Sequence, residues 1–259
     1  MNQNRINNLF EEKQGNILSI YFCAGHPEAD STLPVLRALQ AGGVDMVEIG
    51  IPFSDPMADG PVIQGAATRA LANGMSLRKL FEQLRDVRKE ITMPLLLMGY
   101  LNVIYKFGFE AFCQQCQACG IDGAIIPDLP FDLYMSDYKE IADRYNLRII
   151  MLITPETSEE RIRLIDQNTS GFIYQVSTDA TTGAQNTFGD STVAYFKRIE
   201  AMGLNNPTLV GFGISNKATL TASRLYSKGS IVGSKFVRLL QESATPAEAV
   251  SALMHALEQ

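Results

Sequence analysis

Apolar runs of about strand length alternate with amphipathic segments along the chain. The apolar runs are rich in branched aliphatic residues, which predicts strands, and the segments between them repeat apolar residues every three or four positions, which predicts helices. The expected strands cover residues 17–25, 44–52, 94–102, 123–130, 147–155, 171–177, 207–215 and 229–234. The expected helices cover residues 31–43, 76–91, 109–120, 133–146, 157–169, 192–203, 216–229 and 246–259.

Eight strands that are each followed by a helix predict a (β/α)8 TIM barrel, a fold of the α/β class. Continuously apolar strands favour the same fold, because a parallel sheet is buried on both faces. Residues 5–13 predict an extra N-terminal helix that covers the N-terminal end of the barrel. No linker or low-complexity tract divides the chain, so we expect residues 1–259 to form a single TIM-barrel domain.

Composition narrows the class of protein. With 46% apolar residues and 20 glycines, the 259-residue chain can bury one large core. The formal net charge of −6 and the scattered Lys and Arg residues indicate no nucleic-acid partner. The polar N-terminus lacks a signal region, and the apolar run at 94–100 is too short to span a bilayer. We therefore expect a cytoplasmic protein without a membrane partner.

Three cysteines, Cys113, Cys116 and Cys119, have a spacing that resembles a metal or cluster motif. On the helix predicted at 109–120 they drift around one face, which suits core packing, and the remaining Cys23 lies in a separate strand. The chain has only two histidines, so we expect no metal site. The strand cores also contain no lysine for Schiff-base chemistry, since Lys235 falls in the helix after the last strand.

Glu48 interrupts an otherwise apolar strand. Alternate side chains of a strand point to opposite faces, so Val47, Ile49 and Ile51 are expected to face the helices and Glu48 the barrel interior. The C-terminal ends of barrel strands hold the active sites of this fold. A structural ion pair is the alternative, but Arg148 is the only cation in the strand cores. An unpaired carboxylate there would have a raised pKa, which suits a general acid/base.

Asp59 follows in residues 53–71, which we expect to be a long loop over the barrel mouth. Loops of this length usually bind or close over a ligand. Asp55 precedes a proline and Asp59 precedes a glycine, so either residue fits a turn as well as a functional role. Loop chemistry alone leaves both interpretations open.

Glycine-rich turns end the last two strands, with Gly211, Gly213 and Ser215 after one and Gly233 and Ser234 after the other. Barrels often bind phosphate at these turns, where backbone N–H groups and a helix N-terminus face the ligand. Tight strand–helix connections are the alternative explanation. The polar loop at 177–189 is expected to act as a lid. An apolar wall for a flat substrate is expected from Phe22, Ile126, Ile153 and Phe212.

The run VEIGIPFSDPMADGPVIQGAATRAL, followed in order by IIPDLP, TTG, GFGIS and IVGS, closely resembles the α chain family of tryptophan synthase over essentially the whole chain. This resemblance implies retro-aldol cleavage of indole-3-glycerol phosphate to indole and glyceraldehyde 3-phosphate, without a cofactor. It assigns the acid/base role to Glu48, and it assigns to Asp59 the carboxylate that holds the indole N–H.

The resemblance also implies which residues bind the substrate. The phosphate is assigned to Gly183, Gly213, Gly233 and Ser234, and the indole to Phe22, Tyr174 and Phe212; Thr182 is the remaining substrate-binding residue of the lid. The chain departs from the family pattern at Thr178, where many members carry an arginine, so lid closure is expected to differ.

A partner is implied as well, namely the pyridoxal-phosphate β chain of tryptophan synthase, which receives indole through a tunnel in an αββα (α2β2) tetramer. Residues 53–71 and 99–110 are expected to contribute to docking. Two other functions stay open: another phosphate-binding barrel, such as an indole-glycerol-phosphate synthase or a phosphoribosyl isomerase, or a barrel whose main role is to activate a partner. The missing strand lysine disfavours the synthase, and the pair of Glu48 and Asp59 disfavours the isomerase.

Overall fold

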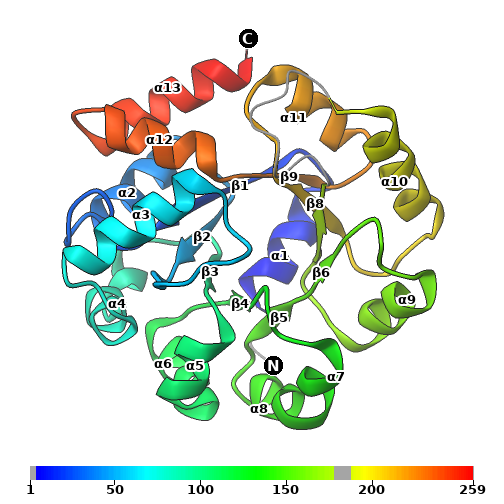
Figure 1. Ribbon diagram of the computed structural model, residues 1–259, viewed down its shortest axis with the longest axis horizontal. Coiled ribbons are helices and arrows are strands. Elements are labelled where there is room, and N and C mark those ends of the chain that lie inside the picture. The colour runs from blue at the N-terminus through cyan, green and yellow to red at the C-terminus, as the bar shows by residue number, and fades with distance from the viewer. Residues whose placement is uncertain (1–3, 178–187, 259) are drawn as a thin grey trace.

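A computed structural model describes residues 4–177 and 188–258. All of its strands join one parallel sheet in the order β5-β4-β3-β2-β1-β9-β8-β7-β6, and helices surround this sheet (Figure 1). The strands are β1 (Ile17–Cys23), β2 (Met46–Gly50), β3 (Leu95–Met98), β4 (Gly123–Ile125), β5 (Arg148–Ile150), β6 (Leu152–Ile153), β7 (Ile173–Val176), β8 (Thr208–Gly211) and β9 (Gly229–Val232). The predicted TIM-barrel fold is confirmed.

The barrel closes through the strand expected at residues 147–155. That strand is divided at Met151 into β5 and β6, which are the two ends of the hydrogen-bonded order. β5 pairs with β4, and β6 pairs with β7. Because the two pieces are continuous in sequence, one divided strand joins both edges of the sheet, and no exposed sheet edge is left at this point.

The helices are α1 (Arg5–Glu12), α2 (Thr32–Ala41), α3 (Pro61–Ala72), α4 (Leu77–Leu84), α5 (Leu101–Phe107), α6 (Phe109–Cys119), α7 (Phe131–Leu133), α8 (Lys139–Arg144), α9 (Glu159–Asn168), α10 (Asp190–Ala201), α11 (Lys217–Arg224), α12 (Ser234–Glu242) and α13 (Pro246–Glu258). A 3-10 turn, η1 (Val87–Lys89), follows α4, and a π-helical turn, η2 (Tyr134–Tyr138), joins α7 to α8. Within the described ranges, no helix is both long and apolar enough to cross a membrane.

The prediction of a loop at 53–71 is wrong for the second half of that segment, which forms α3. Pro61 occupies the start of this helix after an extended Gly60, an arrangement that suits a helix N-terminus. Ile63, Ala67 and Ala70 recur at helical spacing and are buried. The loop that remains between β2 and α3 covers residues 51–60, and Asp59 lies just before the start of α3.

The predicted N-terminal helix is confirmed as α1, which lies across the centre of the ring of strands in Figure 1. Its Ile6 is fully buried and packs in a cluster with interior side chains of the strands, among them Ile17, Met46 and Leu96. α1 therefore covers one end of the barrel, and its Ile6 packs against the interior side chains. The functional end must be the opposite one, at the C-terminal ends of the strands.

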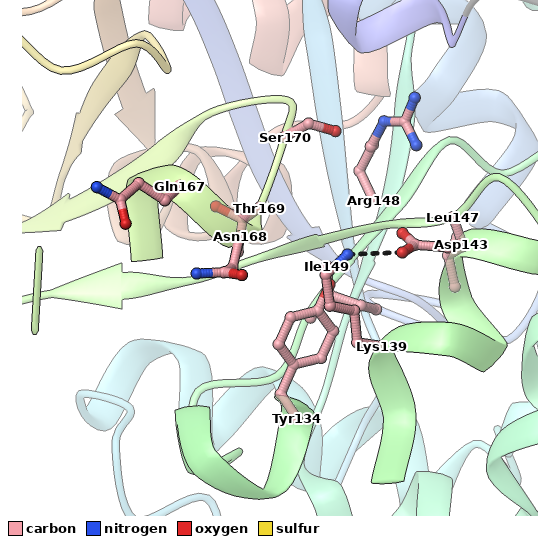
Figure 2. A pocket seen from close by; sticks show the side chains of 10 residues that line it. All are labelled: Tyr134, Lys139, Asp143, Leu147, Arg148, Ile149, Gln167, Asn168, Thr169 and Ser170. Carbon is pink, nitrogen blue, oxygen red and sulfur yellow. Dashed lines mark hydrogen bonds and ion pairs between the residues drawn. The ribbon is translucent and has the colours of Figure 1, made fainter. Parts of the chain in front are cut away.

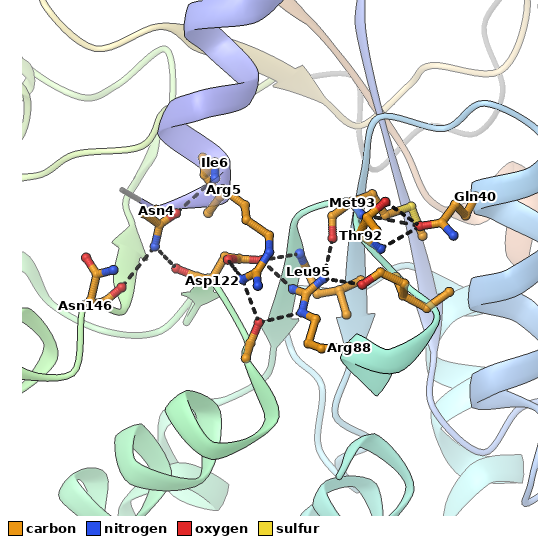
Figure 3. A network of polar contacts seen from close by, with 12 residues as sticks. Asn4, Arg5, Ile6, Gln40, Arg88, Thr92, Met93, Leu95, Asp122 and Asn146 are labelled. Atoms are coloured by element: carbon orange, nitrogen blue, oxygen red, sulfur yellow. Dashed lines mark hydrogen bonds and ion pairs between the residues drawn. The ribbon is translucent and has the colours of Figure 1, made fainter. Parts of the chain in front are cut away.

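A polar network around Asp122 holds this closed end together (Figure 3). The Asp122 carboxylate, 4% exposed, accepts hydrogen bonds from Arg5 at 2.9 Å and from Arg88 at 2.6 Å. It also accepts the backbone N–H of Leu95 at 2.9 Å. Asn4 donates to the carbonyl of Asp122 at 2.8 Å. One buried carboxylate thus connects α1, η1 and the start of β3.

Candidate active site

Glu48 lies on β2 with its side chain inside the barrel, as the alternation of the strand predicts. It is fully buried, and its Oε1 accepts a hydrogen bond from the hydroxyl of Ser19 at 2.9 Å. Its Oε2 is buried and has no hydrogen-bond partner among the residues that the structure describes. Arg148, considered above as a structural partner, instead donates its Nε to Asn7 at 3.0 Å. The carboxylate therefore has one fixed oxygen and one free oxygen.

The buried environment of Glu48 changes the pH at which its carboxyl group loses its proton. Burial raises its pKa from 4.5 to about 8, and the hydrogen bond from Ser19 offsets part of this shift. A carboxyl group in an apolar site keeps its proton near neutrality because the charged form loses its hydration. Such a group can both give and take a proton at physiological pH, which is what general acid/base catalysis requires.

Asp59 lies in the loop between β2 and α3, where Tyr100 holds it. The Tyr100 hydroxyl donates to Oδ2 of Asp59 at 2.8 Å and accepts the N–H of Ala58 at 3.0 Å. Burial raises the pKa of Asp59, and the hydrogen bond from Tyr100 opposes the rise. Burial raises the pKa of Tyr174 as well, with further contributions from the charges of Glu48 and Asp59. Tyr174 thus lies within electrostatic range of both carboxylates.

Tyr174 and Phe212 form an aromatic pair beside these carboxylates. Their ring centroids are 6.1 Å apart, in an edge-on arrangement. Phe212 has a φ of 69°, in the left-handed region that non-glycine residues rarely adopt. Its carbonyl accepts a hydrogen bond from Ser177 at 3.2 Å. Strain at a position held by its neighbours is typical of a functional site.

The structure does not bring Phe22 to the barrel mouth. Ser19 points into the barrel toward Glu48, so Tyr21 shares its side of β1 and Phe22 faces the helices. A Cβ added to Gly50 would lie 2.3 Å from the Tyr21 hydroxyl. Burial raises the pKa of Tyr21, and nearby charges that include Asp59 and Glu48 raise it further. Tyr21 is therefore the aromatic residue of β1 at this end, and it is not among the site residues predicted from the sequence.

The glycine-rich turns lie next to each other. β8 pairs with β9, with Gly211 opposite Ile231, so the turns that follow them are neighbours. Gly213 has a φ of 73°, and Gly233 directly precedes α12, which begins at Ser234. Backbone N–H groups at such a helix start can face an anion. Thr182 and Gly183, together with Thr178, lie outside the described residues.

The cysteine triplet packs in the core. Cys113, Cys116 and Cys119 are all buried on α6. Burial raises the pKa of Cys113 to about 12, well above physiological pH. Across residues 4–177 and 188–258, no three His, Cys, Asp or Glu side chains are grouped so that they could hold a metal ion.

A cavity of about 190 Å³ lies at the opposite end of the barrel, near the start of β5 and the end of α9 (Figure 2). Polar side chains line it, among them Tyr134, Arg148 and Ser170, and Lys139 pairs with Asp143 at 2.6 Å at its edge. None of the predicted site residues lines this cavity. Glu48 and Asp59 lie at the other end of the barrel, so this cavity is separate from the candidate active site.

A TIM barrel with a buried glutamate of raised pKa and a second held carboxylate, both at the C-terminal ends of the strands, is typical of barrel enzymes that work by acid/base chemistry. Residues 7–259 match the family model described as "Tryptophan synthase alpha chain". The chain belongs to the tryptophan synthase α chain family.

Individual relatives are similar to this chain over almost its whole length. The tryptophan synthase alpha chain of Parabacteroides distasonis is 64% identical over 256 residues, which are 99% of this chain and 100% of that protein. The crystal structure of tryptophan synthase subunit alpha from Legionella pneumophila is similar with a TM-score of 0.88 at 33% identity, covering 99% of this chain and 98% of that one. A chain of the tryptophan synthase complex from Pyrococcus furiosus is similar with a TM-score of 0.84 at 32% identity. The match covers 94% of this chain and 98% of that one.

Proposed function

We propose that this chain cleaves indole-3-glycerol phosphate to indole and glyceraldehyde 3-phosphate, the α reaction of L-tryptophan biosynthesis. Membership of the tryptophan synthase α chain family supports this reaction. The observation that carries it is Glu48, a fully buried carboxylate whose pKa burial raises to about 8 and whose Oε2 has no hydrogen-bond partner within residues 4–177 and 188–258. A group with these properties can protonate a carbon atom at neutral pH.

The two carboxylates have different roles in this proposal. Glu48 donates a proton to C3 of the indole ring, which converts the ring to an indolenine that can leave. Asp59 accepts the indole N–H and stabilises the positive charge that develops on the ring nitrogen. The glyceryl hydroxyl then loses its proton, its C–O bond becomes a carbonyl, and the electron pair of the broken C–C bond returns to the ring. Glu48, now ionised, takes up that hydroxyl proton.

The remaining residues position the substrate. The indole lies against Tyr174 and Phe212, whose rings are 6.1 Å apart, and Tyr21 takes the place expected for Phe22. The phosphate lies at the turns after β8 and β9, where it accepts hydrogen bonds from backbone N–H groups of Gly213, Gly233 and Ser234. Thr182 and Gly183 remain the expected contacts from the lid.

A tryptophan synthase β chain is the proposed partner, in an αββα tetramer that passes indole directly from one site to the other. Two large side chains near the C-terminal end of the barrel are available for docking, since Met57 is 94% exposed and Tyr105 is 70% exposed. Exposed apolar side chains of this size often mark a protein interface. The proposed location is the cytoplasm, where the chain functions as a single barrel domain over residues 1–259.

Indole release by the purified chain, alone and with a β chain, tests the proposal. We expect release by the parent chain, stimulation by the β chain, and loss of release in Glu48→Gln. A Glu48→Gln chain that still stimulates the β chain would separate catalysis from docking. Absence of indole from the parent under both conditions would overturn the proposed reaction.

A further inference from the structure

Ser19 makes the one hydrogen bond to the Glu48 carboxylate that is found in the described part of the chain. Both residues are fully buried, on adjacent strands β1 and β2, with 2.9 Å between the hydroxyl and Oε1. Glu48 is paired in register with Leu96 of β3 on its other side. The serine hydroxyl is therefore the polar group that holds this carboxylate in an otherwise apolar barrel interior.

Packing alone does not explain a serine at this position. Ile17, two residues earlier on the same face of β1, packs with Met46 and Leu96 in the interior cluster. A buried hydroxyl costs free energy unless it is hydrogen bonded, and an apolar side chain would fill the space without that cost. The hydroxyl of Ser19 finds its partner in Glu48, so the two residues form a unit.

We propose that Ser19 is a positioning residue that fixes the Glu48 carboxyl group and decides which of its oxygens carries the catalytic proton. The Ser19 hydroxyl donates to Oε1, so the proton of the neutral acid stays on Oε2, which has no partner in the described part of the chain. Oε2 is thus the oxygen that meets the substrate. This inference rests on the proposed function of Glu48 as the proton carrier.

The hydrogen bond also adjusts when Glu48 gives up its proton. Burial raises the pKa of Glu48 to about 8, and the Ser19 hydroxyl lowers it. Removal of the hydroxyl therefore leaves the acid protonated to higher pH. Because hydrogen bonds to charged groups are stronger than those to neutral ones, we expect the shift to be about one pH unit.

The test compares Ser19→Ala with Ser230→Ala, which is a matched control. Ser230 is also a fully buried serine on a barrel strand, but its hydroxyl lies 2.5 Å from that of Ser223 instead of near Glu48. In Ser19→Ala we expect kcat for indole release to fall about tenfold, KM to stay within about twofold, and the alkaline limb of the pH profile to move up by about one unit. Ser230→Ala leaves the limb in place, and Ser19→Thr restores it.

A titration that does not depend on activity separates this inference from the proposed reaction. The protein is labelled with ¹³C at the glutamate carboxyl carbons, and NMR follows the Glu48 signal as the pH changes. Glu48→Gln identifies that signal. Ser19→Ala moves this titration upward; an unchanged titration overturns the inference even if the parent cleaves its substrate. If Ser19→Ala does not fold, Ser19→Cys replaces it, because a thiol is a weaker donor and gives a smaller upward shift. A parent that releases no indole defeats the proposed reaction, and the titration then still decides whether Ser19 lowers the pKa of Glu48.

Discussion

The hydroxyl of Tyr100 lies 2.8 Å from Oδ2 of Asp59 and so connects the end of β3 to the loop after β2. The same hydroxyl accepts the N–H of Ala58 at 3.0 Å, and Gln64 donates to the carbonyl of Asp59 at 2.8 Å. These contacts fix the aspartate, and no hydrogen bond to its Oδ1 is found among the described residues. A carboxylate that must meet one N–H of a substrate benefits from being held before the substrate arrives.

Tyr100→Phe should therefore weaken catalysis without unfolding the barrel. The substitution removes the hydrogen bond that lowers the pKa of Asp59, so that pKa rises further and the acid limb of the pH–rate profile moves upward. We expect kcat/KM for indole release to fall about tenfold. Tyr145→Phe is the control, since the hydroxyl of Tyr145 donates to the exposed Glu110 at 3.3 Å, away from Asp59. Equal effects of the two substitutions would argue against a role for Tyr100.

Glu48→Gln should stabilise the protein at high pH. The folded pKa of Glu48 is about 8 against 4.5 for the free side chain, so between these values the folded state holds a proton that the unfolded chain has lost. Stability therefore falls as pH rises through this window. Glutamine carries no such dependence, and its advantage in unfolding free energy should grow by up to about 5 kcal/mol. Urea unfolding of both chains at about pH 5 and about pH 9 measures this; a constant difference would contradict it.

The orientation of Glu48 could be predicted because a strand has a period of two and the flanking Val47 and Ile49 mark the outer face. The same reasoning fails on β1, because every residue from Ile17 to Cys23 is buried. The sequence therefore does not show which of these residues face the barrel interior. The resemblance assigned Phe22 to the indole pocket, and the contacts of Ser19 with Glu48 and of Tyr21 with Gly50 reveal that Tyr21 is the inward residue.

Contacts between residues that are far apart in the chain could not be predicted from the sequence. Tyr100 is 41 positions from Asp59, and Ser19 is 29 positions from Glu48, so neither pair leaves a local pattern. Helix α3 was missed for a different reason. Its start is rich in Pro, Gly and Asp, which are turn residues, and these concealed the helical repeat of Ile63, Ala67 and Ala70.

Asp122→Asn should destabilise the protein strongly. Asp122 is 4% exposed and pairs with both Arg5 and Arg88, so the amide would leave the half-buried Arg88 without a carboxylate. We expect the free energy of unfolding to fall by about 3 kcal/mol in urea titration. Asp132→Asn, which breaks an exposed pair with Arg161, should leave stability unchanged. A weak effect at Asp122 would mean that the packing of α1 does not depend on this network.

The buried thiols should react only when the protein unfolds. Burial raises the pKa of Cys113 to about 12 and that of Cys116 well above its ordinary value, so thiolate is scarce at neutral pH. Cys119 donates to the carbonyl of Phe81 at 3.6 Å and is also buried. We expect a thiol reagent to label these residues in urea and to label the native chain at a rate set by opening of the fold. Rapid labelling of the native chain would contradict their packing in the core.

The two neighbouring aromatic residues of β1 allow one substitution to be compared on both faces of the strand. Phe22 is fully buried and faces the helices, whereas Tyr21 is 8% exposed and its hydroxyl lies against Gly50 at the end of β2. Phe22→Leu should lower the free energy of unfolding by about 1–2 kcal/mol through lost packing, with KM unchanged. Tyr21→Leu should raise KM for indole-3-glycerol phosphate several-fold, because the proposed function places this side chain against the substrate. Steady-state indole release and urea unfolding on both variants measure the two quantities, and a rise in KM at Phe22 with none at Tyr21 would reverse the assignment of the strand's faces.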